Sequence, residues 1–199
     1  MHLILKVLIL NTTLVTASIY ANEYDTQCAN NKYSQHLVDL IIRDHEQQRT
    51  KLRCDKRLVN AAIEKVHEMA KTEFIFHGRA NGRLRDQGVE LPPYYGIGNA
   101  NQVEALAGGQ KSPKLAWKSF KESAPHADHL LARNAFYLKQ TLIGAAHIFL
   151  PNTSHGHYWV VYITEEDNAS KKNIFHGPIP NKTSQGVFYQ SLNEKKPIN

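Results

Sequence analysis

The spacing of hydrophobic residues changes along this chain of 199 residues. Over residues 34–48 and 56–71 they recur at steps of three and four, which predicts two amphipathic helices. Asp55 is placed to cap the second helix, because a short acidic side chain can accept from the first free N–H groups. Ser112 followed by Pro113 marks the start of a further helix, since proline is favoured at the first helical position.

Glycine and proline are concentrated in residues 78–101, which we interpret as one long loop. Tyr94, Tyr95 and apolar residues interrupt this stretch, so it is expected to pack on the domain rather than to act as a linker. Long loops inside a domain tend to be functional. A short helix is predicted over 123–131, with Ser123 as its cap.

The C-terminal half has a different pattern. Continuous apolar runs over 141–150 and 158–163, separated by a turn at 153–156, predict an antiparallel hairpin. Short edge strands are predicted at Phe175 and 187–189. Because helices come first and strands follow, the pattern favours an α+β fold over a parallel β-α-β arrangement.

Residues 1–21 have the pattern of a secretory signal peptide, with Lys6, a short apolar run and small residues near the cleavage point. The run is shorter than the roughly 20 apolar residues of a membrane span. We therefore expect a secreted or periplasmic protein. Its expected parts are a polar lead-in over 22–35, one domain over 36–165 and a C-terminal extension over 166–199.

The sequence contains two cysteines, Cys28 and Cys54. In an exported chain two cysteines indicate one disulfide, and in the chain-entropy model it would stabilise the fold by roughly 3.5 kcal/mol. If the chain were not exported, two free thiols would be the expected state. A zinc ribbon is excluded because there is no third cysteine ligand.

Charge and composition narrow the classes of partner. Apolar residues make up 42% of the chain, enough for a core, and the formal net charge is +6. Basic residues are densest over 43–57, but acidic residues dilute them and no aromatic residues are interleaved. This pattern argues against nucleic-acid binding and leaves open a weak attraction to anionic membrane surfaces.

The candidate chemistry lies in His77, Glu104 and His126. His77 follows an apolar approach, Glu104 lies inside an apolar stretch, and His126 lies near a predicted helix start. A buried glutamate is rare unless it is paired, and histidine is a good partner. Taken singly, each has a structural interpretation as strong as a functional one, and no zinc-protease, serine-hydrolase or phosphate-loop motif is present.

Taken together, several segments resemble the cysteine-rich secretory, antigen 5 and pathogenesis-related (CAP) superfamily, most closely its bacterial branch. The matching residues are 39–46, Leu52, 54–62, 67–70, 76–77, 101–107, Trp117, 123–126, 143–146 and 158–160. The resemblance covers about residues 36–163. It implies a three-layer α-β-α sandwich around a mainly antiparallel sheet.

The resemblance also implies a cleft with two histidines and usually two glutamates. Matched by motif, the histidines are His77 and His126, and the first glutamate is Glu104. Phe120 occupies the position of the second glutamate. Glu122 lies on the same predicted helix but is expected to point elsewhere.

His129 follows His126 by three residues and so shares its helix face. It could supplement the site, but a solvated position is the expectation.

Two imidazoles and one carboxylate form a plausible divalent-cation site, with Zn²⁺ the natural choice, although the same three residues would also suit a structural hydrogen-bond cluster. The favoured function is that of a monomeric binding module for a small apolar ligand, such as a lipid or sterol, or for a protein. The alternative is a metal-assisted hydrolase that uses the same cleft.

Overall fold

The computed structural model describes residues 28–97, 100–165 and 167. The expected signal peptide and the C-terminal edge strands predicted at Phe175 and 187–189 lie outside these residues. Within the described part of the chain, none of the helices combines the length and apolarity needed to cross a membrane.

Helices predominate among the described residues before the C-terminal hairpin. They are α1 (Lys32–Ile42), α2 (Lys56–Thr72), α3 (Ala80–Asp86), the 3₁₀ helix η1 (Pro93–Tyr95), α4 (Pro113–Glu122), α5 (Ala124–Leu131) and α6 (Ala135–Leu138). The side chains of Asp55 and Ser112 accept from the first turns of α2 and α4, which confirms both predicted helix starts. Ser123 is the residue before α5, but its hydroxyl makes no capping hydrogen bond.

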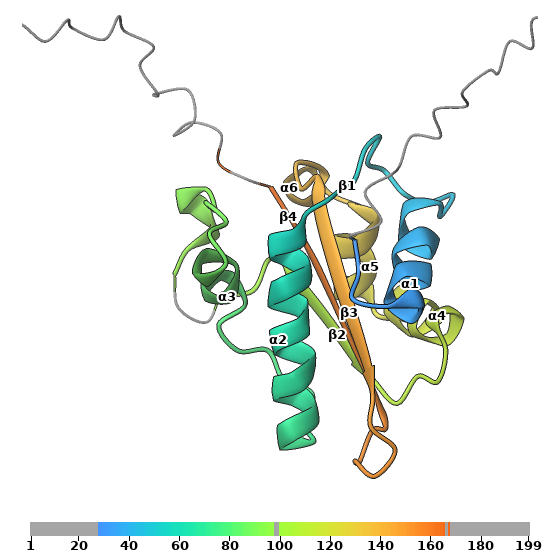
Figure 1. Cartoon of the computed structure of the whole chain (residues 1–199). Helices are drawn as coiled ribbons and strands as arrows, with labels where there is room; N and C mark the ends of the chain where they lie inside the picture. The colour runs from blue at the N-terminus through green and yellow to red at the C-terminus, as the bar shows by residue number, and fades with distance from the viewer. Residues whose placement is uncertain (1–27, 98–99, 166, 168–199) are drawn as a thin grey trace, which may run out of the picture. The chain divides into compact units, whose positions relative to one another are not determined.

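One mixed sheet carries the fold (Figure 1). Its strands are β1 (Arg53–Cys54), β2 (Glu104–Gly108), β3 (Leu142–Phe149) and β4 (His157–Thr164), in the order β1-β3-β4-β2. β3 and β4 form the predicted antiparallel hairpin, β2 pairs antiparallel with β4, and β1 pairs parallel with β3. The prediction of a mainly antiparallel sheet is therefore confirmed.

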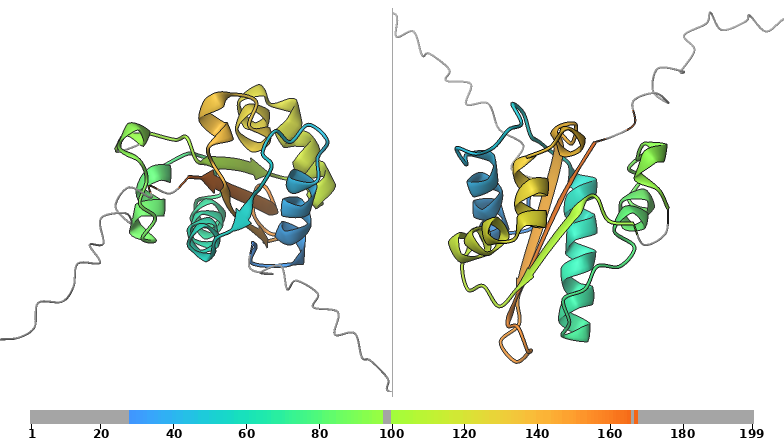
Figure 2. Two further views of the ribbon diagram at one scale, coloured as in Figure 1. Left: turned by 90° about the horizontal axis from the view of Figure 1, so that it is seen from above. Right: turned by 180° about the vertical axis from the view of Figure 1, so that it is seen from behind.

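Helices cover both faces of the sheet (Figures 1 and 2). On one face, residues of α2 and α3 pack against Leu106, Val160 and Tyr162. On the other face, residues of α1, α4 and α5 pack against Trp159 and Val161. Because successive strand residues point to opposite faces, one set of strands serves two cores. The expected α-β-α layers and the α+β class are confirmed.

Some predicted boundaries were wrong. The first helix ends at Ile42 instead of continuing to 48, because the Asp44 side chain accepts from the backbone N–H of Glu46 and turns the chain. That helix also begins at Lys32, inside the expected lead-in, where Asn31 caps it.

The stretch 78–101 is not one loop. It contains α3, whose Ala80 and Leu84 are buried, and η1, which buries Tyr95 while Tyr94 stays exposed. These helices are too short to show a helical period in the sequence.

The Cys28–Cys54 disulfide is confirmed, with the two Cα atoms 4.6 Å apart. It joins the segment before α1 to β1. Cys28 also accepts through its carbonyl from the backbone N–H of Ala145 at 2.8 Å, and Ala29 forms a parallel bridge to the same residue. The outer edge of β3 is therefore covered by two short segments that the disulfide ties together.

Gly144 sets the distance between α2 and the sheet. A β-carbon at this position would lie 2.5 Å from the backbone nitrogen of Val59 and 2.6 Å from the carbonyl carbon of Leu58. These contacts are with backbone rather than with flexible side chains. Glycine at this position therefore lets the first turn of α2 lie directly on β3.

Gly144→Ala is expected to lower the free energy of unfolding by about 3 kcal/mol or more, because the helix must move off the strand to accommodate a methyl group. Gly82→Ala in α3 is the matched control, since its β-carbon would meet only the Arg79 side chain, at 3.4 Å or more. Urea unfolding measures both variants. Equal stability of Gly144→Ala and the wild type would contradict the close approach.

Two histidines are buried on the face of the sheet that α1, α4 and α5 cover. His147 is 4% exposed, packs on Trp159 with ring centroids 4.0 Å apart, and lies 3.0 Å from His157 between ring nitrogens. Burial, with a smaller effect of His157, lowers the pKa of His147 to about 4. His129 is also 4% exposed, and burial lowers its pKa to about 3.

Acid is therefore expected to destabilise the fold through these histidines. The unfolded chain protonates them below pH of about 6.5, whereas the folded chain keeps them neutral, so stability falls as the pH drops from about 6.5 towards 4. His147→Phe, which keeps an aromatic ring, should remove about 3 kcal/mol of the stability change between pH 7 and pH 4. Urea unfolding at several pH values tests this, and an unchanged pH dependence in the variant would contradict it.

Candidate functional site

Three different elements carry the candidate residues. His77 lies in the segment between α2 and α3, Glu104 is the first residue of β2, and His126 lies in the first turns of α5. α2 ends where Glu73 adopts a left-handed conformation (φ 54°), which turns the chain back towards the sheet. Since β2 is an edge strand, groups from both helical layers can meet beside it.

These residues line one small cleft of about 110 Å³. Its lining residues are His77, Asn101, Gln102, Glu104, Pro125, His126, His129 and Tyr137. The cleft therefore brings His77, Glu104 and His126 together from positions that are far apart in the sequence.

Glu104 is the buried member of the cleft, with a side chain that is 0% exposed. Its Oε1 lies 2.9 Å from Nδ1 of His77, and its Oε2 accepts a hydrogen bond from the hydroxyl of Tyr162. Both carboxylate oxygens thus have a partner within the protein, as a buried charge requires. Glu104 thus has the partners that a glutamate in an apolar stretch needs.

His77 is half-exposed and has two neighbours at one ring nitrogen. Nδ1 lies 2.9 Å from Oε1 of Glu104 and 2.9 Å from Nδ2 of Asn101. An ionised carboxylate can only accept, so Nδ1 must carry the proton and donate to Glu104. Asn101 then donates instead to the backbone carbonyl of Glu104, at 3.1 Å. In this tautomer the lone pair of His77 lies on Nε2.

His126 is the second histidine of the cleft. Burial, followed by the nearby His77, lowers its pKa, so its imidazole is neutral near pH 7. Its ring meets Phe120 edge to face, with centroids 5.2 Å apart. Phe120, which replaces the second glutamate implied by the family resemblance, therefore supports His126 by packing.

His129 was expected to be solvated, and this is wrong. The side chain is buried, Nε2 lies 3.2 Å from the carbonyl oxygen of Ile163, and the ring packs against Tyr137 at 5.0 Å. It forms part of the cleft wall because its helix turn packs against the end of β4. In a short helix the sequence pattern around a buried histidine does not differ from that around an exposed one, so the burial of His129 could not be predicted.

Glu122 lies away from the cleft, as expected from its place on the helix. Its carboxylate is 3.6 Å from the ammonium of Lys118 and is largely exposed. It lines a broader groove of about 830 Å³ between α1 and α4. Glu122 therefore does not contribute to the site around His77.

A second group, Asp44, His45 and Glu46, places potential metal-ligand atoms within 4.8 Å of one another. Cationic side chains already form ion pairs with these carboxylates. The ammonium of Lys121 is 3.0 Å from both Asp44 and Glu46, and Arg133 is 2.6 Å from Glu46. The group therefore serves first to connect α4 to the turn after α1.

Four polar residues of the site were not predicted from the sequence. Asn101, Gln102 and Tyr137 line the cleft, and Tyr162 lies behind Glu104. Asn101 lies in the same matched stretch as Glu104 and offered a signal. Tyr162 lies inside an apolar strand run, where its hydroxyl could not be distinguished from an ordinary core aromatic.

Glu104→Gln is expected to lower the free energy of unfolding by about 1–3 kcal/mol, because a neutral amide cannot accept from both Tyr162 and His77 with the strength of a carboxylate. Glu122→Gln, at an exposed position, should change it by less than about 0.5 kcal/mol. Guanidinium unfolding at pH 7 compares the two variants. A loss of equal size in both would mean that the buried carboxylate has no special role.

Comparisons with known proteins give one structural likeness. No protein-family model matches the chain, and no curated protein matches it. Among solved structures, an outer surface protein from Borrelia burgdorferi is 16% identical, with a TM-score of 0.48 over 66% of this chain and 90% of that chain. A likeness at this level carries no argument about function.

Proposed function

We propose that this chain is an exported binding module of the CAP superfamily whose cleft holds a divalent cation, with Zn²⁺ preferred, through His77 and His126. The observation that carries the proposal is the buried carboxylate of Glu104 on Nδ1 of His77. Metal-binding histidines almost always donate their other ring N–H to a carboxylate, a carbonyl or water.

Two features of the cleft residues support such a cation. The Nε2 lone pair of His77 is available in the tautomer that Glu104 imposes, and burial keeps His126 neutral near pH 7. Glu104 itself has both oxygens engaged, so it orients His77 rather than acting as a third ligand. Zinc bound by two imidazoles would supply a positive centre for a carboxylate or carbonyl group of a ligand.

The lining of the cleft supports a binding role. Asn101, Gln102 and Tyr137 offer neutral hydrogen-bonding groups to a ligand. A space of about 110 Å³ suits a small polar head group.

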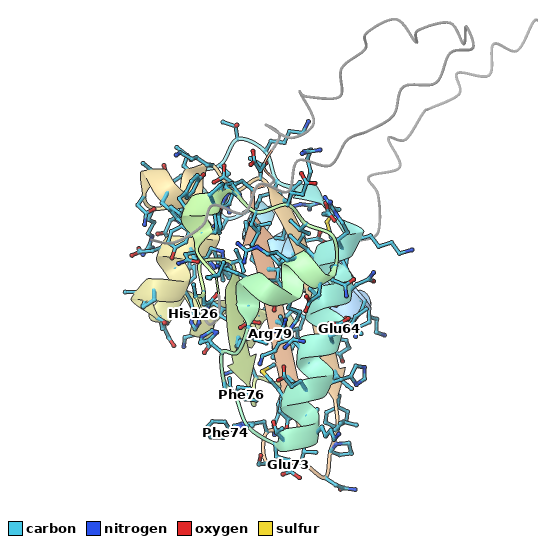
Figure 3. The ribbon with its side chains drawn as sticks, turned by 90° about the vertical axis from the view of Figure 1, so that its left-hand side faces the viewer. Glu64, Glu73, Phe74, Phe76, Arg79 and His126 are labelled. Carbon is cyan, nitrogen blue, oxygen red and sulfur yellow. A yellow bond between two sulfur atoms is a disulfide. The ribbon has the colours of Figure 1, made fainter. Side chains whose placement is uncertain are left out.

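Phe74 and Phe76 lie on the same side of the molecule as His126 (Figure 3). Phe74 is 63% exposed. An amphipathic ligand, with a polar group in the cleft and an apolar part on these rings, fits this arrangement.

Export is supported by the disulfide. Disulfides persist in oxidising compartments and are rare in the cytosol of most organisms. The Cys28–Cys54 bond therefore agrees with a secreted or periplasmic protein.

Zn²⁺ is expected to bind with modest, micromolar affinity at pH 7.5 and more weakly at pH 5.5, because protons compete for the imidazole nitrogens. His77→Ala and His126→Ala should each remove the binding. His67→Ala, at an exposed position of α2, is the matched control and should leave it unchanged. Isothermal titration calorimetry on chelator-treated protein measures Zn²⁺ binding by the wild type and the three variants.

Two results would contradict the proposal. Binding that survives His77→Ala but is lost in His45→Ala would place the cation at the Asp44 group. An absence of Zn²⁺ binding by the wild type would leave the cleft as a hydrogen-bond cluster.

A further inference from the structure

β2 forms one edge of the sheet, next to β4 (Figure 1). Two printed bonds fix which backbone groups of this edge strand face β4. The N–H of Gly109 donates to the carbonyl of His157 at 2.8 Å, and the N–H of Ile163 donates to the carbonyl of Val103 at 2.9 Å. Gly109 and Val103, on either side of β2, are therefore hydrogen-bonded to β4.

Hydrogen-bonded and non-hydrogen-bonded pairs alternate along an antiparallel ladder. In the register of β2 on β4, Ala105 and Ala107 continue the bonded set. Glu104, Leu106 and Gly108 belong to the other set. Their backbone N–H and C=O groups therefore point away from β4, towards the outer edge of the sheet.

At Glu104 these outward groups already have a partner, the side-chain amide of Asn101. Oδ1 of Asn101 accepts from the N–H of Glu104 at 2.9 Å, and Nδ2 donates to the carbonyl of Glu104 at 3.1 Å. These are the two bonds that a residue of a neighbouring antiparallel strand would make. Asn101 thus replaces a strand residue at this position and ends the open part of the edge.

Leu106 and Gly108 have no such partner among residues 28–97, 100–165 and 167. Unpaired N–H and C=O groups on an edge strand are a template for a further strand. The side chain of Ile75 lies against the edge here, since an ideal β-carbon on Gly108 would be 2.7 Å from its Cδ1. Ile75 therefore offers an apolar contact to a side chain of an added strand on the α2 face.

The open part of the edge leads directly to the cleft. Glu104 and Asn101 line the cleft together with His77 and His126. Because β2 begins at Glu104, a strand added antiparallel to β2 would have its carboxyl end at the cleft, and a parallel strand its amino end. A cation held by the two histidines attracts a carboxylate, so charge complementarity selects the antiparallel direction.

We propose that the outer edge of β2 binds the C-terminal segment of a partner polypeptide as an added antiparallel strand. Its backbone pairs with Leu106 and Gly108, and its terminal carboxylate lies in the cleft. The inference rests on the proposed function for the positive charge at the cleft, and it names the class of ligand. Because main-chain groups make the contacts, affinity depends on an extended backbone more than on one peptide sequence.

Amide hydrogen exchange, followed by NMR in the peptide-free protein, tests the edge itself. The N–H groups of Leu106 and Gly108 should exchange at least about tenfold faster than those of Ala105 and Ala107, which bond to β4. Equally slow exchange at all four in dilute protein would overturn the inference, because the edge would already be paired. Protection of Leu106 and Gly108 that appears only as the protein concentration rises would also overturn it, since the occupant would be a second copy.

Peptide binding tests the added strand. Random hexapeptides with a free carboxyl terminus are selected on the Zn²⁺-loaded protein, and the best binder should protect Leu106 and Gly108 from exchange. N-methylation of its residues whose N–H faces β2 should weaken binding about tenfold or more, whereas N-methylation of the alternate residues, the matched control, should change it less than about threefold. Failure to select any peptide, or an equal loss in both sets, would overturn the inference.

The terminal carboxylate is tested by amidation of the selected peptide. Amidation should weaken binding about tenfold in the Zn²⁺-loaded protein and should not weaken it after chelation. The difference should disappear in His126→Ala and persist in His67→Ala, which changes an exposed position of α2. Equal binding of acid and amide to the Zn²⁺-loaded wild type would overturn the placement of the carboxylate in the cleft.

The same measurements separate this inference from the proposed function. Zn²⁺ binding that depends on His77 and His126, without protection of Leu106 and Gly108 by any selected peptide, overturns the added strand and leaves the cation site. Protection of both amides by a peptide, in a protein that calorimetry shows to bind no Zn²⁺, overturns the proposed cation while the added strand stands.

Discussion

A buried negative charge is the constraint around which this fold is arranged. Glu104 opens the edge strand β2 with a side chain that water does not reach. Its two oxygens need donors, and these come from the segment between α2 and α3 and from β4. The register of β2 on β4 pairs Glu104 with Tyr162. The pairing of the two strands therefore also places the Tyr162 hydroxyl where it can donate to the Glu104 carboxylate. A shift of register by one residue would separate the carboxylate from its donor and turn it to the other face.

The two helical layers position His77 and His126 through different contacts. On one side, Gly144 lets α2 lie directly on β3, and the end of this helix leads into Phe76 and His77. On the other side, the buried guanidinium of Arg49 donates to the carbonyls of His129 and Leu130 at 2.7 and 2.9 Å. These bonds hold the last turn of α5. Neither histidine depends on a long, unsupported loop for its position.

The sequence was informative where a pattern repeats or where a single residue conflicts with its surroundings. Helix periodicity over 56–71 and the apolar runs at 141–150 and 158–163 are long enough to predict α2 and the hairpin. Glu104 stood out because a carboxylate among apolar neighbours demands a partner. The short helices α3 and α6 span two turns or fewer, so no period could identify them. Tyr162 was missed, and His129 was expected to be solvated, for another reason: the partner of each lies far away in the sequence, and tertiary contacts alone select it.

The connection at Cys28 also has a mechanical meaning. From this residue the chain is tied to β1 by the disulfide and to β3 by the Ala145 hydrogen bond, while the amide side chains of Asn30 and Asn31 donate to the carbonyl of His147 at 3.0 and 2.8 Å. The hydrogen bonds follow β3, so tension applied at Cys28 would load them together in shear rather than open them one after another. The bond between the cysteines would pass part of that load to the start of α2 through β1. Force applied on the N-terminal side of the domain would thus pass into its central sheet, and its first helix would be shielded from being peeled away.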